Sequence, residues 1–259
     1  MRTSPQIRAP HPWFSRWFSG YAAKRLRRHF HRVRLLDGES LSDPKDRPLV
    51  IYGNHPSWWD PMAALAIKPI FYPNREAYAP IDAEMLERYG VFKSLGFFGV
   101  ERDSVRGVAG FLDHAEAILR RPRSMLFLTP QSRFADVRER PVRLQRGIAH
   151  LAARVPETVF VPLAMELTYW EESKPELLLS AGTAATHAPG ASRGETLARL
   201  EQSLEQAMDR LAEASIARRS EAFSDLFIGS AGVGGLYDAW RALKAIARGR
   251  KINLHHSER

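Results

Sequence analysis

Cysteine is absent from the 259-residue chain. This absence excludes disulfide bridges, a thiol nucleophile and cysteine-ligated metal sites. The chain also lacks any run of about 18 uninterrupted apolar residues, the length that a membrane-spanning helix requires. We therefore expect any contact with a membrane to be made at its surface, and a reducing compartment suits the chain.

Acidic residues are few relative to basic ones. The chain has 29 Asp and Glu against 38 Lys and Arg, which gives a net charge of +9. An excess of positive charge favours polyanionic partners, such as anionic lipid headgroups, phosphorylated substrates or nucleic acid. The remaining composition, with 44% hydrophobic and 26% charged residues, is that of a folded globular protein, and the length suits one large domain.

Acidic residues are missing altogether from residues 13–36. Basic residues are frequent there, and aromatic residues recur at helical spacing: Trp13, Phe14, Trp17, Phe18 and Tyr21. A basic amphipathic helix with an aromatic face is typical of a segment that lies in the membrane interface. The alternative is an ordinary docked helix whose aromatic side chains belong to the core.

Strand-like and helix-like patterns alternate through the middle of the chain. Short apolar runs predict strands over residues 49–52, 125–128, 159–163 and 177–179, and amphipathic patterns predict helices over residues 62–67, 104–121 and 144–154. This alternation predicts an α/β fold with a mixed, mostly parallel sheet flanked by helices. In such sheets, functional sites form beyond the carboxyl ends of the strands.

The C-terminal third begins with a long predicted helix, from about residue 195 to residue 220. Residues 223–235 contain the string GSAGVGG, which lacks the Lys-Ser/Thr ending of a phosphate-binding loop, so we interpret them as a flexible connector. Residues 236–250 form a second basic amphipathic stretch. The predicted organisation is an N-terminal membrane-surface segment (1–36), a central domain (37–222) and a C-terminal connector with a basic segment (223–259).

A histidine and an aspartate follow the first predicted strand in the string YGNHPSWWDP. Pro56 disfavours a helical conformation for His55 and suits the first position of a helix. We therefore expect His55 to lie outside a helix that contains residues 57–60, and to fold back toward Asp60. The carboxylate would then fix one ring nitrogen while the other takes a proton from a substrate hydroxyl. The alternative is a capping histidine beside an aspartate that the helix dipole favours.

Four blocks of the sequence resemble the glycerolipid (lysophosphatidic acid type) acyltransferase family. NHPSWWD matches its N-H-x4-D signature, and three further blocks follow in the family's order: LGFFGVERD (95–103), FLTPQSRF (127–134) and VFVPLAMEL (159–167). The resemblance runs from about residue 47 to residue 182. Four blocks in order are far more specific than one. The resemblance implies a glycerolipid acyltransferase-like fold for the central domain, with His55 and Asp60 as the catalytic residues.

The resemblance also implies which residues hold the acyl acceptor. The second block contributes Arg102, and the third contributes Gln131, Ser132 and Arg133. Gln131 replaces the family's glutamate and the family's glycine is missing, so the acceptor need not be lysophosphatidic acid. Arg146, in the basic segment after the third block, is a further candidate partner for an anion, because guanidinium groups suit phosphate. The alternative for each of these arginines is a solvated surface side chain.

Two pairs of neighbouring aromatic residues lie in these blocks. Trp58 and Trp59 follow His55, and Phe97 and Phe98 belong to the second block. Each pair can line a channel for the acyl chain or contact the bilayer. The alternative is packing in the core, which we expect for at least one member of each pair.

The substrates and partners also follow from the resemblance. We expect acyl-CoA or acyl carrier protein as acyl donor, a lysolipid acceptor, and no metal or other cofactor. We expect a peripheral position on the cytoplasmic face of the membrane. Three alternatives stay open: a catalytically silent lipid-binding protein of the same fold, a hydrolase that uses water as acceptor, and a basic nucleic-acid-binding protein. The last is not expected, because no nucleic-acid-binding motif is present.

Overall fold

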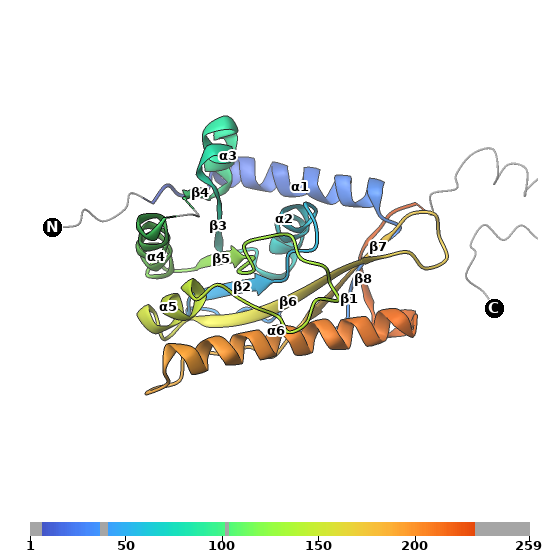
Figure 1. Ribbon diagram of the computed structural model, residues 1–259. Coiled ribbons are helices and arrows are strands. Elements are labelled where there is room, and N and C mark those ends of the chain that lie inside the picture. Colours follow the sequence, from blue (N-terminus) through green and yellow to red (C-terminus); the bar gives the residue numbers. More distant parts are fainter. Residues whose placement is uncertain (1–6, 37–40, 102–103, 231–259) are drawn as a thin grey trace, which may run out of the picture.

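The computed structural model describes residues 7–36, 41–101 and 104–230 (Figure 1). Eight strands of these residues form one sheet in the order β4-β3-β5-β2-β6-β7-β1-β8. In chain order they are β1 (Arg32–Leu35), β2 (Leu49–Gly53), β3 (Glu76–Asp82), β4 (Phe97–Val100), β5 (Ser124–Leu128), β6 (Val159–Thr168), β7 (Glu176–Ala181) and β8 (Ser224–Ile228). The strands β6–β7 and β1–β8 pair antiparallel, whereas the other neighbours pair parallel. The expected mixed, mostly parallel sheet is confirmed.

Six α-helices of the described residues cover both faces of this sheet (Figure 1). They are α1 (Pro12–His29), α2 (Asp60–Phe71), α3 (Ala83–Arg88), α4 (Val105–Leu119), α5 (Gly147–Arg154) and α6 (Arg193–Ile216). Two short 3-10 turns lie between a helix and the next strand: η2 (Gly90–Leu95) between α3 and β4, and η3 (Ser220–Ala222) between α6 and β8. The helices α1 and α2 pack on one face, and α4, α5 and α6 pack on the other.

Strand β2 shows how one short sequence builds both cores. Successive side chains of a strand point to opposite faces. Leu49 and Ile51 therefore join the core under α1 and α2, and Val50 and Tyr52 join the core under α4, α5 and α6. All four are fully buried, which explains why β2 is continuously apolar rather than alternating. Because β2 lies between β5 and β6, its carboxyl end lies near the middle of the sheet.

The N-terminal helix is shorter than expected. We predicted helix over residues 13–36, but α1 ends at His29 and Arg32–Leu35 form β1. The prediction is wrong there because Val33 continues the helical spacing of Leu26 and Phe30 but also alternates with Leu35 as in a strand, and pairing with β7 and β8 decides between the two. Arg34 gains ion-pair partners in that pairing, Glu176 at 3.1 Å and Asp225 at 3.0 Å.

The expected connector over residues 223–235 is wrong over residues 224–228, which form β8 along the outer edge of β1. Residues 231–235 and the predicted basic segment 236–250 lie outside the described residues. Strand β3 was not predicted, because Pro80 and the flanking acids Glu76 and Asp82 hide its apolar pattern. The predicted boundaries of the central domain, at residues 36 and 222, stay a prediction. Strands β1 and β8, which lie just outside these boundaries, both pair in the sheet.

Candidate active site

The loop that carries His55 is tied to the centre of the sheet. Asn54 follows β2 and pairs with the backbone of Met165 on β6: its side-chain nitrogen donates to the Met165 oxygen at 2.9 Å, and its side-chain oxygen accepts from the Met165 nitrogen at 2.8 Å. Both partners are buried. This two-bond bridge fixes the loop at the point where the strand ends.

His55 folds back toward Asp60 as expected, although the helix begins later than we predicted. Residues 57–59 form a turn, with the Trp59 N–H donating to the Ser57 hydroxyl at 3.2 Å, and α2 starts only at Asp60. The distance between His55 Nδ1 and Asp60 Oδ2 is 2.7 Å. Because Nδ1 is engaged, Nε2 is the ring nitrogen left to accept a proton.

Asp60 is held by several donors in a buried position. Its side chain is 2% exposed, and the Ser57 hydroxyl donates to Oδ1 at 3.2 Å. Burial raises the pKa of Asp60 above its ordinary value, and the hydrogen bond from His55 opposes that shift. Ionisation of Asp60 therefore costs free energy unless neighbouring donors stabilise the carboxylate. Buried carboxylates with perturbed pKa values of this kind are typical of catalytic sites.

The loop after β5 encloses His55 from a second side. The buried Gln131 side chain accepts a hydrogen bond from the His55 backbone N–H at 3.0 Å, and the Ala135 N–H donates to the His55 carbonyl oxygen at 3.0 Å. The exposed ring of Phe134 stacks on the imidazole with a centroid distance of 4.4 Å. Sequence reasoning placed Gln131 near the acceptor and did not anticipate that it would contact the histidine loop.

The remaining predicted acceptor residues lie in different surroundings. Arg133 is exposed and forms an ion pair with Glu139. Ser132 and Arg146 are exposed, with Arg146 just before the first turn of α5. Arg102 lies outside the described residues. The structure therefore brings Gln131 against the loop of His55, whereas the described residues Ser132, Arg133 and Arg146 form no hydrogen bond or ion pair with His55 or Asp60.

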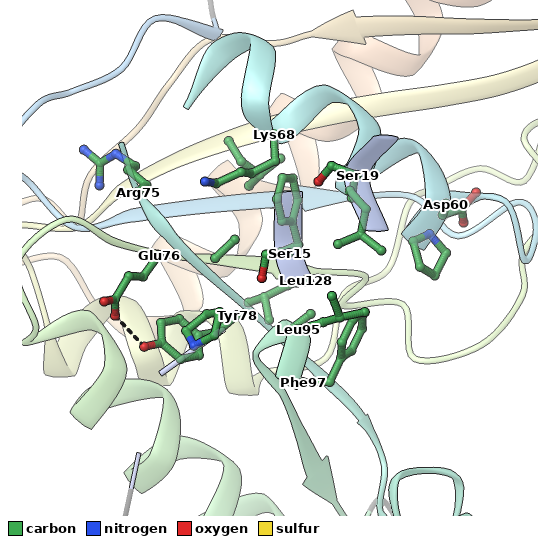
Figure 2. A pocket seen from close by; sticks show the side chains of 18 of the residues that line it. Ser15, Ser19, Asp60, Lys68, Arg75, Glu76, Tyr78, Leu95, Phe97 and Leu128 are labelled. Atoms are coloured by element: carbon green, nitrogen blue, oxygen red, sulfur yellow. Dashed lines mark hydrogen bonds between the residues drawn. The ribbon is translucent and has the colours of Figure 1, made fainter. Parts of the chain in front are cut away.

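A cavity of about 520 Å³ extends from the His–Asp pair along the sheet face covered by α1 and α2 (Figure 2). Side chains from one face of α1 and one face of α2 line it, together with β3 and the ends of β2 and β5. Asp60 and Arg75 lie at opposite sides of the view in Figure 2, with Leu95, Phe97 and Leu128 between them. Sequence reasoning missed most of this lining, although the spacing of Pro61, Ala64 and Leu65 on α2 is the signal that could have found it.

The two members of each aromatic pair lie in different surroundings. Phe97 lines the cavity, whereas Phe98 is buried in the core on the other face of the sheet. Trp58 is exposed, and Trp59 packs edge-on against Phe30 with a centroid distance of 5.0 Å. One member of each pair therefore belongs to the core, as expected.

The outer face of α1 is aromatic and basic. Trp13, Trp17 and Tyr21 are 68%, 53% and 43% exposed, whereas Ala22 and Leu26 on the inner face are buried. The helix thus docks through small and aliphatic residues and leaves Trp13, Trp17 and Tyr21 outside, contrary to the alternative that they belong to the core, whereas Phe14 and Phe18 are half-buried. Among the described helices, none is long and apolar enough to cross a membrane.

The fold has a solved counterpart. The chain is similar to the crystal structure of the 1-acyl-sn-glycerophosphate (LPA) acyltransferase PlsC from Thermotoga maritima, with a TM-score of 0.53. This chain has the fold of that acyltransferase. The similarity covers 77% of this chain and 79% of the Thermotoga chain at 16% sequence identity. No protein-family model matches the sequence, and no curated protein matches it. The acyltransferase fold is therefore retained although little of the sequence is shared.

Proposed function

We propose that the protein is an acyltransferase that moves a fatty acyl chain from a thioester to the hydroxyl of a lysolipid-like acceptor at a membrane surface. The observation that carries this proposal is the hydrogen bond between His55 Nδ1 and Asp60 Oδ2, at 2.7 Å, in the wall of a large apolar cavity. The pair supplies a base, and the cavity supplies room for an acyl chain. The shared fold with PlsC adds an independent reason to expect acyl transfer.

The reaction follows from the geometry of the pair. His55 Nε2 takes the proton of the acceptor hydroxyl as its oxygen attacks the thioester carbonyl carbon. Asp60 keeps the ring oriented and stabilises the imidazolium. The N-terminus of α2, which begins at Asp60, offers partial positive charge to the oxyanion. When the carbon–sulfur bond breaks, the thiolate leaves and receives the proton from His55.

The donor is acyl-CoA or acyl carrier protein, with its chain in the cavity. His55 and Asp60 are among the residues that line the cavity, so a chain that occupies it presents its thioester to the base. Most of the lining is aliphatic or aromatic, and each buried methylene contributes about 0.8 kcal/mol. No metal ion or further cofactor has a part in this reaction.

The acceptor approaches from the membrane side. The exposed Trp13, Trp17 and Tyr21 would enter the interface, and the exposed Arg16 and Lys24 on the same helix would meet anionic headgroups. Because the inner face of α1 lines the cavity, the helix that meets the lipid also adjoins the reaction site. The position is peripheral on the cytoplasmic face, where acyl-CoA and acyl carrier protein are made.

The loop after β5 and the residues near it would bind the polar headgroup of the acceptor. Arg133 would exchange Glu139 for an anionic headgroup, with Ser132, Arg102 and Arg146 as further partners. Gln131 would act by holding His55 in position, because its side chain accepts a hydrogen bond from the His55 backbone N–H. These assignments leave the acceptor's chemical identity to experiment.

The test is acyl transfer from radiolabelled acyl-CoA and acyl carrier protein to a panel of lysolipids in vesicles that contain anionic lipid. We expect labelled diacyl product with the native chain and none with His55→Ala. Labelled free fatty acid in place of product would identify a hydrolase instead. Binding to the vesicles without any turnover, by folded protein across the whole panel, would favour a silent lipid-binding protein.

A further inference from the structure

The cavity carries a positive charge in its wall, far from the His–Asp pair. Lys68 lies on the face of α2 that also presents Pro61, Ala64 and Leu65 to the cavity. Figure 2 shows its side chain on the opposite side of the cavity from Asp60. A lysine in the wall of a site for a plain hydrocarbon chain is unfavourable, because burying an ammonium group against methylenes costs free energy.

The ammonium group of Lys68 is poorly satisfied by the protein. Within the described part of the chain, its only hydrogen bond is to the backbone oxygen of Pro73, at 3.2 Å, and it forms no ion pair. An ammonium group has three donors. Lys68 is half-buried, and this partial burial lowers its pKa below the ordinary value.

A hydroxyl on the facing helix is also unsatisfied. Ser15 of α1 lines the same cavity, and its buried Oγ has no hydrogen-bond partner among the described residues. A serine hydroxyl can rotate toward a nearby acceptor. By contrast, Glu76 and Arg75 at the cavity's far side already have partners: Glu76 accepts from Tyr78, and Arg75 pairs with Asp43. Lys68 and Ser15 are thus two donors in the cavity wall with hydrogen-bonding capacity left for a ligand.

We propose that the cavity selects an acyl chain that bears an oxygen substituent, and that Lys68, assisted by Ser15, binds this oxygen. The inference rests on the proposed function, and it adds the chemical class of the acyl chain. An oxygen acceptor on the chain would replace water at the ammonium group, whereas a plain chain would remove that water without replacing it.

The spacing along α2 sets the position of the oxygen. Eight residues separate Asp60 from Lys68, which corresponds to ~12 Å along a helix axis. An extended hydrocarbon chain with carbon–carbon bonds of about 1.5 Å advances ~1.3 Å per carbon. A chain whose thioester lies at His55 therefore reaches Lys68 after roughly nine or ten carbons, so the substituent belongs in the middle or outer part of the chain.

The experiment compares three stearoyl-CoA donors: unsubstituted, hydroxylated about ten carbons from the thioester, and hydroxylated beside the thioester. Binding of their non-transferable thioether analogues is measured alongside transfer. We expect the mid-chain hydroxyl to raise kcat/KM and affinity roughly tenfold over the other two, the effect of one hydrogen bond to a charged donor. In Lys68→Met, which keeps length but removes charge, this preference should disappear.

The matched control is Lys93→Met, which removes an exposed lysine outside the cavity and should leave the preference unchanged. Equal use of all three donors by the native chain, or an unchanged preference in Lys68→Met, would overturn the inference. Failure of the proposed function would look different, because no donor would be transferred to any acceptor. The binding of the thioether analogues would still report whether the mid-chain oxygen is recognised.

Discussion

Two histidine–carboxylate pairs lie at different strands of the sheet, and they differ in burial, in distance and in access to a cavity. His55 and Asp60 lie 2.7 Å apart at the carboxyl end of the central strand β2, and His55 keeps part of its ring exposed at a cavity. His31 and Glu176 lie 3.3 Å apart at the start of the neighbouring strands β1 and β7, with both side chains buried. Arg34 also contacts Glu176, so that carboxylate is shared with a permanent cation. A histidine beside an acid is therefore a base only where a substrate can reach it.

The largest effect that separates the two pairs is expected from Asp60→Asn. Loss of the carboxylate should lower kcat by about 10²- to 10⁴-fold, because the imidazolium loses its partner and its orientation. Burial raises the pKa of Asp60, so ionisation is less favourable in the folded chain than in the unfolded chain. The contribution of Asp60 to stability therefore falls as pH rises through its pKa.

At neutral pH, removal of this charge should leave the thermal midpoint unchanged or raise it. Calorimetry and transfer assays on the same preparations measure both quantities. A variant that lost activity only because it had unfolded would contradict the assignment of Asp60 as a positioning residue.

The opposite result is expected from His31→Ala. This change removes a neighbour from the buried Glu176 and should reduce the free energy of unfolding by about 1–3 kcal/mol. Transfer activity per folded molecule should stay near the native value, because β6 and β7 separate β1 from β2 and His31 does not line the cavity. Urea titration followed by transfer assays makes the comparison. A hundredfold loss of kcat with a fold as stable as the native one would show that the second pair takes part in catalysis.

A smaller effect should follow from Gln131→Ala, which frees the backbone N–H of His55. We expect kcat to fall about tenfold, in keeping with roughly 1.4 kcal/mol for one lost buried hydrogen bond. Gln131→Glu retains an oxygen acceptor and should keep most of the activity. Steady-state kinetics of both variants tests whether Gln131 acts through His55. A larger change in the acceptor KM than in kcat would instead assign Gln131 to the acceptor.

The smallest effect is expected from Ser57→Ala. Its hydroxyl is one of several donors to Asp60, at 3.2 Å, and His55 and the Ser57 N–H remain in the variant. We expect kcat to decrease by about two- to fivefold, because the lost hydrogen bond contributes only part of the stabilisation of Asp60. The neutral comparison is Ser104→Ala, whose hydroxyl caps α4 away from the pair. Equal losses in both serine variants would mean that the change reflects stability alone.

The sequence predicted the contact between His55 and Asp60 better than it predicted the edges of the fold. His55 and Asp60 were accessible to prediction because proline and a strand end act locally, within six residues. Strand β1 was not, because Val33 satisfies a helical pattern until the pairing with β7 and β8 is known. The cavity was only partly predictable, since it depends on how α1 crosses α2, which local spacing does not determine. The acceptor residues remain predictions on the resemblance alone.

Strand β8 has a consequence for how the chain is made. It pairs with β1, so residues 32–35 near the start of the sequence acquire their outer neighbour from residues 224–228. During synthesis, nearly two hundred further residues are added after β1 before β8 leaves the ribosome. Until then its outer backbone groups and Arg32 lack the strand and the Asp225 carboxylate that they contact in the finished chain. The sheet can therefore be completed only after residues 224–228 have been synthesised, and a fragment that stops before residue 224 would expose an unpaired edge open to aggregation.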